Sequence, residues 1–301
     1  MKSNEALVHF HLPGLFEFYE FYRVFLPLFH THRDWFYPWC DIVSIYGSPE
    51  GCLWGGGRTS DGTADAQDVL FLMDEFGISS RLTFSNSLLE TEHLSDKKCN
   101  SLCRLFEKSK VPGGVIVHSP LLADYLKKNY PQLYLVSSTT KVLTDFGDFK
   151  KELENPDFKY VVPDFRLNKS FEKLYTLSQE EKDKVEFLCN ECCDFGCSSR
   201  KACYENVSRK NLGLSVPDHK CTSSLGDGGY RFSLAKKNPS FISVDDILNI
   251  YLPRGFSNYK IEGRGLGSAV LLEFLLYYMT KPEYQLQVRE EVYLDSMLDL
   301  F

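Results

Sequence analysis

The densest group of chemically reactive side chains is a cysteine segment in the second half of the chain. Five of the ten cysteines lie between Cys189 and Cys203, in the run CNECCDFGCSSRKAC. An apolar run from Val185 to Leu188 comes directly before it and is typical of a buried β-strand. Thiolates at the end of a strand are soft ligands, of the kind that hold zinc or iron–sulfur clusters. The segment therefore predicts a metal or cluster site at one edge of a sheet.

Three cysteines are expected to hold this metal or cluster: Cys193, Cys197 and Cys221. The three-residue gap between Cys193 and Cys197 differs from the CxxC spacing of zinc ribbons and redox pairs, but it still lets two thiolates converge. Cys52 follows the second predicted strand and is the candidate for a fourth ligand. Five other cysteines are expected to be core thiols or unligated neighbours of the site: Cys40, Cys99, Cys103, Cys189 and Cys192.

Short apolar runs alternate with amphipathic stretches along the chain and predict β-strands separated by helices. The strands are expected over residues 7–12, 41–46, 81–85, 114–118, 133–138, 159–163, 185–189 and 258–262. Helices are expected over 64–76, over 120–129 and from Ser243 onward. This order predicts an α/β fold with a parallel sheet, closed as one (β/α)8 TIM-like barrel over residues 1–301. A doubly wound open sheet is the alternative.

The stretch 191–257 is too long for one loop and one helix. It is therefore expected to form a cysteine-bearing insertion between the seventh and eighth strands. The last part, 266–301, is apolar and helix-like, and it is expected to pack on the outside of the barrel.

In such barrels the reactive residues lie at the C-terminal ends of the strands. The residues expected there to carry protons or charge are Lys141, Glu191, Glu262 and Arg264. Those expected to bind substrate are Arg58, Asn86, Ser119, Asp164 and Asn190. Structural roles are the alternative for several of them: helix caps for Asn86 and Ser119, a solvated lysine for Lys141, and an ion pair for Glu262 and Arg264.

Charge and hydropathy exclude some classes of protein. The net charge of −7 argues against sequence-blind binding of nucleic acid, which needs clustered Lys and Arg. No apolar stretch reaches the roughly 20 residues of a membrane-spanning helix. The first residues lack the long apolar region of a secretory signal, so a cytoplasmic protein with reduced thiols is expected.

Several segments together resemble the peptidase U32 family. The run Asn258 to Arg264, NYKIEGR, is similar to the KIEGR segment of that family, and the cysteines after VEFLCNE have a similar placement. Residues 160–168, YVVPDFRLN, resemble its preceding strand and helix start. The N-terminal segments VHFHLPGLFEFYEFY and DIVSIYGSPEGCLWGGGR are similar to its small branch of iron–sulfur proteins. The more widely spaced cysteines of the family are compressed here to Cys193 and Cys197.

This resemblance implies a barrel that holds a 4Fe–4S cluster and carries out oxygen-independent hydroxylation or a related redox modification. Its substrate would be a small or tethered molecule, and an electron donor or partner protein would take part. The residues and the family name leave two other functions open. One is a non-catalytic iron–sulfur or zinc protein that acts as a partner or scaffold, and the other is a metal-dependent peptidase. No HExxH motif or nucleophile elbow supports the peptidase.

Overall fold

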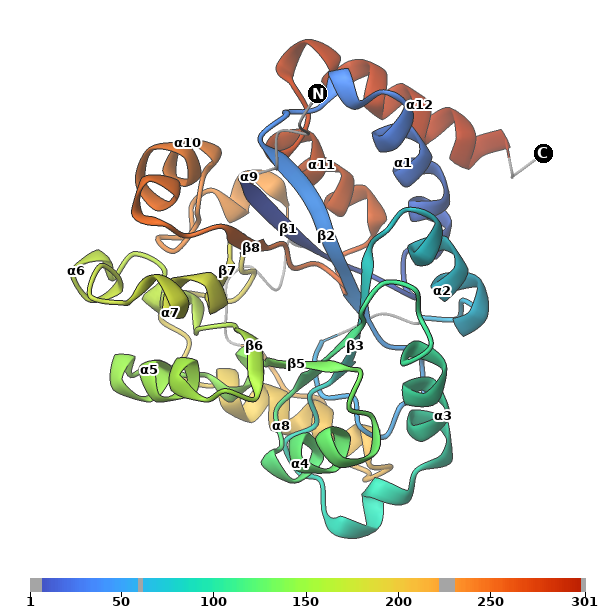
Figure 1. Cartoon of the computed structure of the whole chain (residues 1–301), viewed down its shortest axis with the longest axis vertical. Coiled ribbons are helices and arrows are strands. Elements are labelled where there is room, and N and C mark those ends of the chain that lie inside the picture. The colour runs from blue at the N-terminus through green and yellow to red at the C-terminus, as the bar shows by residue number, and fades with distance from the viewer. Residues whose placement is uncertain (1–6, 59–61, 222–230, 299–301) are drawn as a thin grey trace.

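The computed structural model describes residues 7–58, 62–221 and 231–298, and its centre is one parallel sheet (Figure 1). The strands are β1 (Val8–Pro13), β2 (Cys40–Gly47), β3 (Ser79–Phe84), β4 (Gly114–Val117), β5 (Tyr134–Ser137), β6 (Phe158–Val161), β7 (Glu186–Leu188) and β8 (Asn258–Lys260). Their order is β6-β5-β4-β3-β2-β1-β8-β7. A parallel bridge between Val161 and Val185 brings the two end strands together, so the sheet forms a nearly closed barrel. The predicted (β/α)8 barrel is confirmed.

Helices lie on the outside of the strands, as Figure 1 shows. They are α1 (Tyr19–Thr31), α2 (Ala66–Glu75), α3 (Lys97–Phe106), α4 (Pro120–Asn129), α5 (Phe146–Glu154), α6 (Phe171–Leu174), α7 (Gln179–Lys184), α8 (Arg200–Asn211), α9 (Phe232–Ala235), α10 (Val244–Asp246), α11 (Ser268–Tyr278) and α12 (Gln285–Leu298). Local chemistry explains their starts. The Asp65 carboxylate accepts hydrogen bonds from the first turn of α2, and the Ser119 hydroxyl caps α4, which begins with Pro120.

The stretch between β7 and β8 holds α8, α9 and α10, and α10 continues into a π-helix over Ile247–Tyr251. Helix α8 packs against the loops that follow β3 and β5. The Ser208 hydroxyl accepts a hydrogen bond from the Ser87 amide at 3.1 Å, and Arg200 reaches the Thr139 hydroxyl at 3.4 Å. This stretch therefore covers one side of the C-terminal end of the barrel.

The inside of the barrel has two layers of different chemistry. An apolar layer contains Tyr46, Ile116, Val136, Val162 and Leu188. Nearer the N-terminal ends of the strands lies a buried charged layer of His11, Arg81, Glu186 and Lys260. Since alternate residues of a strand share a face, Glu186 lies on the same side of β7 as Leu188, one step below it. Charged groups in the core of such a barrel are unusual, because branched apolar residues normally fill it.

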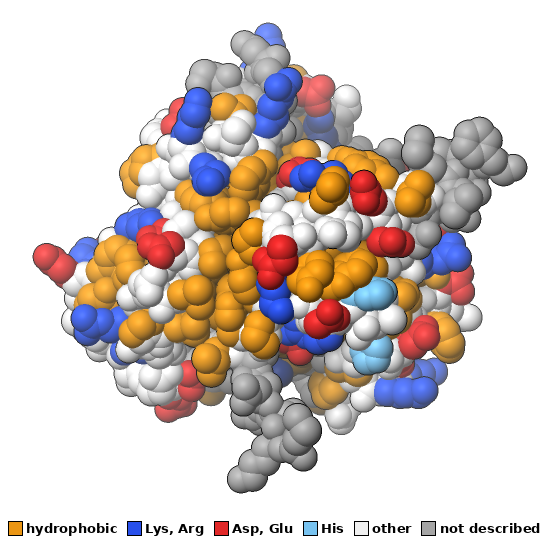
Figure 2. Space-filling model, turned by 90° about the horizontal axis from the view of Figure 1, so that it is seen from above, with side chains coloured by type: hydrophobic (Ala, Val, Ile, Leu, Met, Phe, Trp, Pro, Cys, Tyr) orange, Lys and Arg blue, Asp and Glu red, His pale blue; other side chains and the backbone are white. Residues whose placement is uncertain are grey.

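The C-terminal helices α11 and α12 lie beside α1 on the outside of the barrel (Figure 1). Figure 2 views this side of the molecule and shows hydrophobic side chains across the middle of the face. Among the α12 side chains that the structure describes, the large exposed apolar ones are Leu286, Tyr293 and Leu294. Within the described ranges, none of the helices combines the length and apolarity that a membrane span requires.

Candidate functional site

A cavity opens at the C-terminal ends of the strands, and its volume is about 530 Å³ including the open mouth. Its floor belongs to the apolar layer, with Tyr46, Ile116, Val162 and Leu188. Its wall is polar and comes from several loops and from α8: Arg58, Thr83, Ser85, Ser138, Thr139, Thr140, Tyr204, Glu262 and Arg264. The fold therefore provides a pocket at the end of the barrel where enzymes of this architecture carry their active sites.

Glycines in the loop after β2 bring the Arg58 backbone close to the barrel. A Cβ atom on Gly56 would lie 2.3 Å from the backbone oxygen of Ser85. A Cβ on Gly57 would lie 2.4 Å from Nη2 of Arg264. At Gly56 the obstacle is backbone, so only glycine leaves room there, whereas at Gly57 it is the end of the Arg264 side chain. The glycine run thus places Arg58 at the edge of the cavity by close packing.

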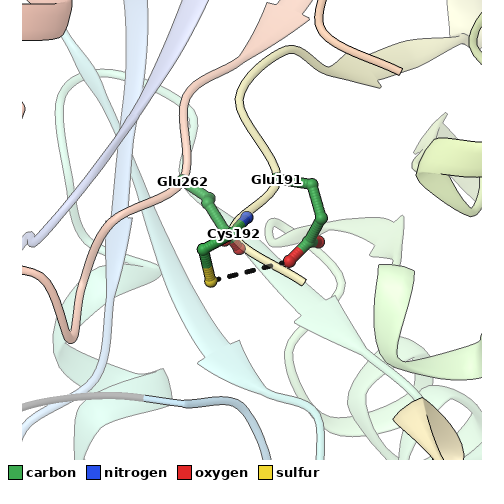
Figure 3. A group of neighbouring side chains, drawn as sticks. All are labelled: Glu191, Cys192 and Glu262. Atoms are coloured by element: carbon green, nitrogen blue, oxygen red, sulfur yellow. Dashed lines mark hydrogen bonds between the residues drawn. The ribbon is translucent and has the colours of Figure 1, made fainter. Parts of the chain in front are cut away.

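Arg58, with 33% of its side chain exposed, lies at the centre of a charged group. Figure 3 shows Glu191 and Cys192, which follow β7, beside Glu262, which follows β8. Their ligand atoms lie within 4.8 Å of one another, a spacing that would suit a metal cation. The guanidinium already occupies this place: Nη2 of Arg58 is 2.8 Å from Glu191 Oε1 and 3.5 Å from Glu262 Oε2. Nη1 of Arg58 also donates to Cys192 Sγ at 3.3 Å. The arginine is the cation of this group.

The charged group extends along the mouth of the barrel as an alternating row. Arg200 Nη2 lies 2.5 Å from the second oxygen of Glu191, and Arg200 Nε lies 3.5 Å from Asp164. Arg166 in turn donates to Asp164 at 2.6 Å. The row pairs opposite charges, but among the described residues Glu191 Oε2, Arg200 Nε and Arg200 Nη1 are buried without a well-formed hydrogen bond. It also fixes the loop after β7 against α8 and the loop after β6.

The two carboxyl groups beside Arg58 have different proton affinities. Burial would raise the pKa of Glu191, but Arg200 and Arg58 together hold this pKa well below its usual range. Burial and then the charge of Glu191 raise the pKa of Glu262. Since Glu262 lines the cavity and Glu191 does not, Glu262 is the carboxyl able to hold a proton near a bound molecule.

The thiols of the cysteine segment lie next to this charged group. Cys193 is buried, Cys197 and Cys203 are partly exposed, and Cys221 is exposed. Burial, then Glu191 and more weakly Cys197, raise the pKa of Cys193 to about 12. Burial raises the pKa of Cys203, and Cys221 and Cys197 raise it further. These thiols are thus close enough for the charge of one to change the pKa of its neighbour.

The arrangement of these thiols can be compared with the needs of two inorganic groups. Tetrahedral zinc with Zn–S bonds of about 2.3 Å holds its sulfurs about 3.8 Å apart. In the described ranges no three thiols come within 4.8 Å of one another. A four-iron cluster holds its thiolates farther apart, because each sulfur binds a different iron. In the described ranges, Cys193, Cys197, Cys203 and Cys221 therefore do not form a ready-made tetrahedral zinc site.

Cys203 was not among the predicted ligands, and Cys52 was. The structure places the buried Cys52 against α3, where a hydrogen bond with Cys99 lowers its pKa. It lies there because the loop after β2 runs outward over the start of α3, where Lys98 Nζ bonds the Glu50 backbone oxygen. Cys203 lies in the first turn of α8, which begins three residues after Cys197. This short connection in the sequence could have indicated that Cys203 lies near Cys197.

Of the other predicted site residues, Arg58, Glu262 and Arg264 line the cavity. Arg264 also lies 3.3 Å from Glu17. Asn190 positions Glu262, because its side chain donates to the Glu262 carbonyl at 3.1 Å and accepts from the Glu262 amide at 2.8 Å. Asp164 belongs to the charged row described above.

Three of the predicted site residues make their contacts away from the residues that line the cavity. Lys141 forms an ion pair with Glu152 of α5. The Ser119 hydroxyl caps α4. The Asn86 amide donates to the backbone oxygens of Leu53 and Ser208, at 2.9 and 3.1 Å. These contacts hold the ends of the strands to neighbouring helices and loops.

Two hydroxyls in the cavity wall were not predicted as site residues. Thr83 Oγ1 and Ser85 Oγ are buried, and neither has a hydrogen-bond partner within the described part of the chain. Both residues line the cavity. A buried polar group without a partner costs free energy, so these hydroxyls are suited to bonding a molecule in the cavity.

Comparisons with known proteins show which solved structure has a similar fold. No family model matches the sequence, and no curated protein matches it. Among solved structures, that of the U32 peptidase Mk0906 matches with a TM-score of 0.53 and 15% sequence identity, over 87% of this chain and 95% of that chain. At this identity the likeness concerns the fold. The chain therefore has a (β/α)8 barrel like that of a U32 peptidase.

Proposed function

We propose that the chain is a redox enzyme that holds an iron–sulfur cluster at the barrel mouth and modifies a small or tethered substrate in the adjoining cavity. The observation that carries this proposal is the cysteine segment after β7, where burial and more weakly Cys197 raise the pKa of Cys193, and burial, then Cys221 and Cys197 raise that of Cys203, beside the charged group around Arg58. These four thiols would hold a 4Fe–4S cluster, which would supply one-electron transfer when bound. The resemblance in the cysteine segment and in NYKIEGR supports the same assignment.

The side chains of the cavity have roles that follow from their chemistry. Arg264 would bind an anionic group of the substrate, because guanidinium groups pair with carboxylates and phosphates, while Arg58 holds Glu191 and Glu262 in the wall. Glu262 would take up or release a proton. Thr83 and Ser85 would donate hydrogen bonds to polar atoms of the substrate. The apolar floor would take its hydrocarbon part.

Within this class, oxygen-independent hydroxylation is the reaction that we propose. If water supplies the oxygen, a C–H bond and a water molecule give a C–OH bond, two protons and two electrons. A two-electron acceptor is then required, and an electron-carrier protein or a second small-molecule substrate would serve. The charged wall offers Glu262 as the group that receives a proton.

The ligand assignment predicts which cysteines are needed for iron. Chains purified and reconstituted without oxygen are expected to contain about four irons and to absorb broadly in the visible range. Replacing any one of Cys193, Cys197, Cys203 or Cys221 by Ser is expected to reduce the iron content strongly, because each thiolate binds its own iron. Iron and sulfide analysis measures this.

Cys52→Ser is the matched control, because this cysteine is buried but lies against Cys99. It is expected to keep its iron. Loss of iron in Cys52→Ser with retention in Cys203→Ser would overturn the assignment of the fourth ligand. The proposed function would be refuted if no preparation contained iron and each chain held one zinc ion.

The metal-dependent peptidase is less well supported. Hydrolysis of this kind needs a metal with an open position for water. The group of ligand atoms with suitable spacing, Glu191, Cys192 and Glu262, already surrounds the guanidinium of Arg58. A non-catalytic iron–sulfur protein would use the same thiols but would have no need for the cavity.

A further inference from the structure

Lys260, the last residue of β8, reaches the floor of the cavity from the charged layer inside the barrel. Its side chain is 5% exposed, and Nζ lies 2.8 Å from Glu186 Oε1. Nζ also lies 3.5 Å from the centre of the Tyr46 ring. The lysine is therefore the member of the charged layer that meets the cavity.

Lys260 shares its carboxylate with a second cation. Arg81 Nη1 lies 2.5 Å from the other oxygen of Glu186, and both side chains are fully buried. His11 Nε2 lies 3.7 Å from Glu186, but burial and then Arg81 hold the pKa of His11 well below its usual value. His11 is therefore neutral. With Lys260 protonated, the layer has two cations and one anion.

Deprotonation of Lys260 is the easiest way to remove the excess positive charge. A guanidinium does not lose its proton in proteins, so Arg81 stays paired with Glu186. A neutral Lys260 then leaves no unpaired buried charge. Burial, then Arg81 and more weakly Arg264, lower the pKa of Lys260 to about 8, against the opposing effect of Glu186. Burial raises the pKa of the neighbouring Tyr46, so this ring stays neutral.

We propose that Lys260 is a nucleophilic amine that binds a small aldehyde or ketone covalently in the cavity. The amine nitrogen attacks the carbonyl carbon and forms a carbinolamine. Loss of one water, formed from the carbonyl oxygen and two amine protons, leaves a C=N bond, so no oxidant or reductant is needed. Thr83 and Ser85 line the same cavity and have hydroxyls suited to the carbonyl oxygen. Ile116, Val162 and Leu188 would contact the hydrocarbon part.

This inference rests on the cavity and the charged layer and is independent of the thiols. A purely structural ion pair between Lys260 and Glu186 would instead keep the lysine protonated and unreactive. The two readings differ in one measurable property, the rate at which the amine reacts with a carbonyl compound near neutral pH.

The test is reductive trapping of the wild-type protein with propanal and cyanoborohydride at pH 7.5, followed by peptide mass spectrometry. At this pH about a quarter of an amine with a pKa of about 8 is neutral, against about one part in a thousand for an ordinary lysine. Lys260 is therefore expected to gain a propyl group at least about tenfold faster than Lys151. Lys151 is the exposed comparison, with 77% of its side chain accessible.

The rate of labelling at Lys260 is expected to level off above about pH 8, whereas that at Lys151 keeps rising toward about pH 10. Labelling of Lys260 no faster than that of Lys151 at pH 7.5 would overturn the proposal, and so would a rate that rises with the same midpoint as Lys151. Lys260→Arg keeps the charge and is expected to lose the labelled peptide. The readout does not depend on iron, so it stays distinct from a failure of the proposed redox function.

Discussion

At the scale of single residues, two cations define the site in opposite ways. Arg58 is permanently charged and holds together Glu191, Cys192 and Glu262, so it fixes the geometry of the mouth. Lys260 shares Glu186 with Arg81, each on its own carboxylate oxygen, and is the cation that can lose its charge. Position in the barrel makes the difference, because Lys260 alone among the charged layer lines the cavity.

The pH dependence of stability tests the state of Lys260. Its pKa is about 8 in the folded chain, and about 10.4 is usual for a lysine in an unfolded one. Between these values the unfolded chain binds a proton that the folded chain lacks, so the free energy of unfolding rises with pH. Relative to Lys260→Met, the wild type is expected to gain about 2 kcal/mol between about pH 8 and pH 10.

Urea unfolding of both proteins at several pH values measures this difference. The comparison with Lys260→Met removes the contributions of buried tyrosines and thiols, which are common to both chains. Lys260→Met is expected to fold, since Glu186 keeps its ion pair with Arg81. Two curves that run parallel from pH 7 to pH 10 would show that the lysine titrates normally.

At the scale of elements, the loop after β2 depends on close backbone contact. Gly56→Ala would place a Cβ atom 2.3 Å from the Ser85 backbone oxygen at the end of β3. Backbone cannot move aside as a side chain can, so the variant is expected to lose about 2 kcal/mol or more of unfolding free energy. Arg58 would shift with the loop, and the charged group would loosen.

Gly196→Ala is the control for this prediction, because the nearest atom to its added Cβ is 3.8 Å away. It is expected to change stability by less than about 0.5 kcal/mol. Thermal or urea unfolding of both variants measures the contrast. Equal stabilities would mean that the loop after β2 is not packed against β3 as described.

The elements were largely predictable from the sequence, and their inner chemistry was not. Each of the eight predicted strand ranges overlaps a strand of the barrel, and the helix over 120–129 begins at Pro120 as its capping residues predict. The charged layer escaped prediction because Arg81, Glu186 and Lys260 each occur singly in separate strands. A lone charge in a strand usually faces solvent, and only the closed barrel turns these three toward one another.

The candidate site was predictable only in part, for a related reason. The rule that reactive residues follow the strands identified Arg58, Glu191, Glu262 and Arg264, which the barrel brings to one end. The same rule also selected Lys141, Ser119 and Asn86, because position after a strand does not say whether a side chain turns toward the mouth or toward a helix. The choice between Cys52 and Cys203 depended on the path of the loops after β2 and β7.

At the scale of the whole molecule, barrel closure joins parts of the chain that are distant in sequence. The loop after β2, the cysteine segment after β7 and the NYKIEGR segment at β8 meet at one mouth. Arg58, which donates to Cys192 Sγ, lines the cavity, and Lys260 lies at the cavity floor. The proposed redox function would place electron transfer and substrate binding at this same end of the barrel.

The most direct test is diffraction at the iron absorption edge from crystals grown without oxygen. The account predicts an anomalous peak surrounded by the sulfurs of Cys193, Cys197, Cys203 and Cys221, next to the mouth of the cavity. Those four sulfurs packed singly with no iron peak between them, or a peak that belongs to zinc, would contradict it.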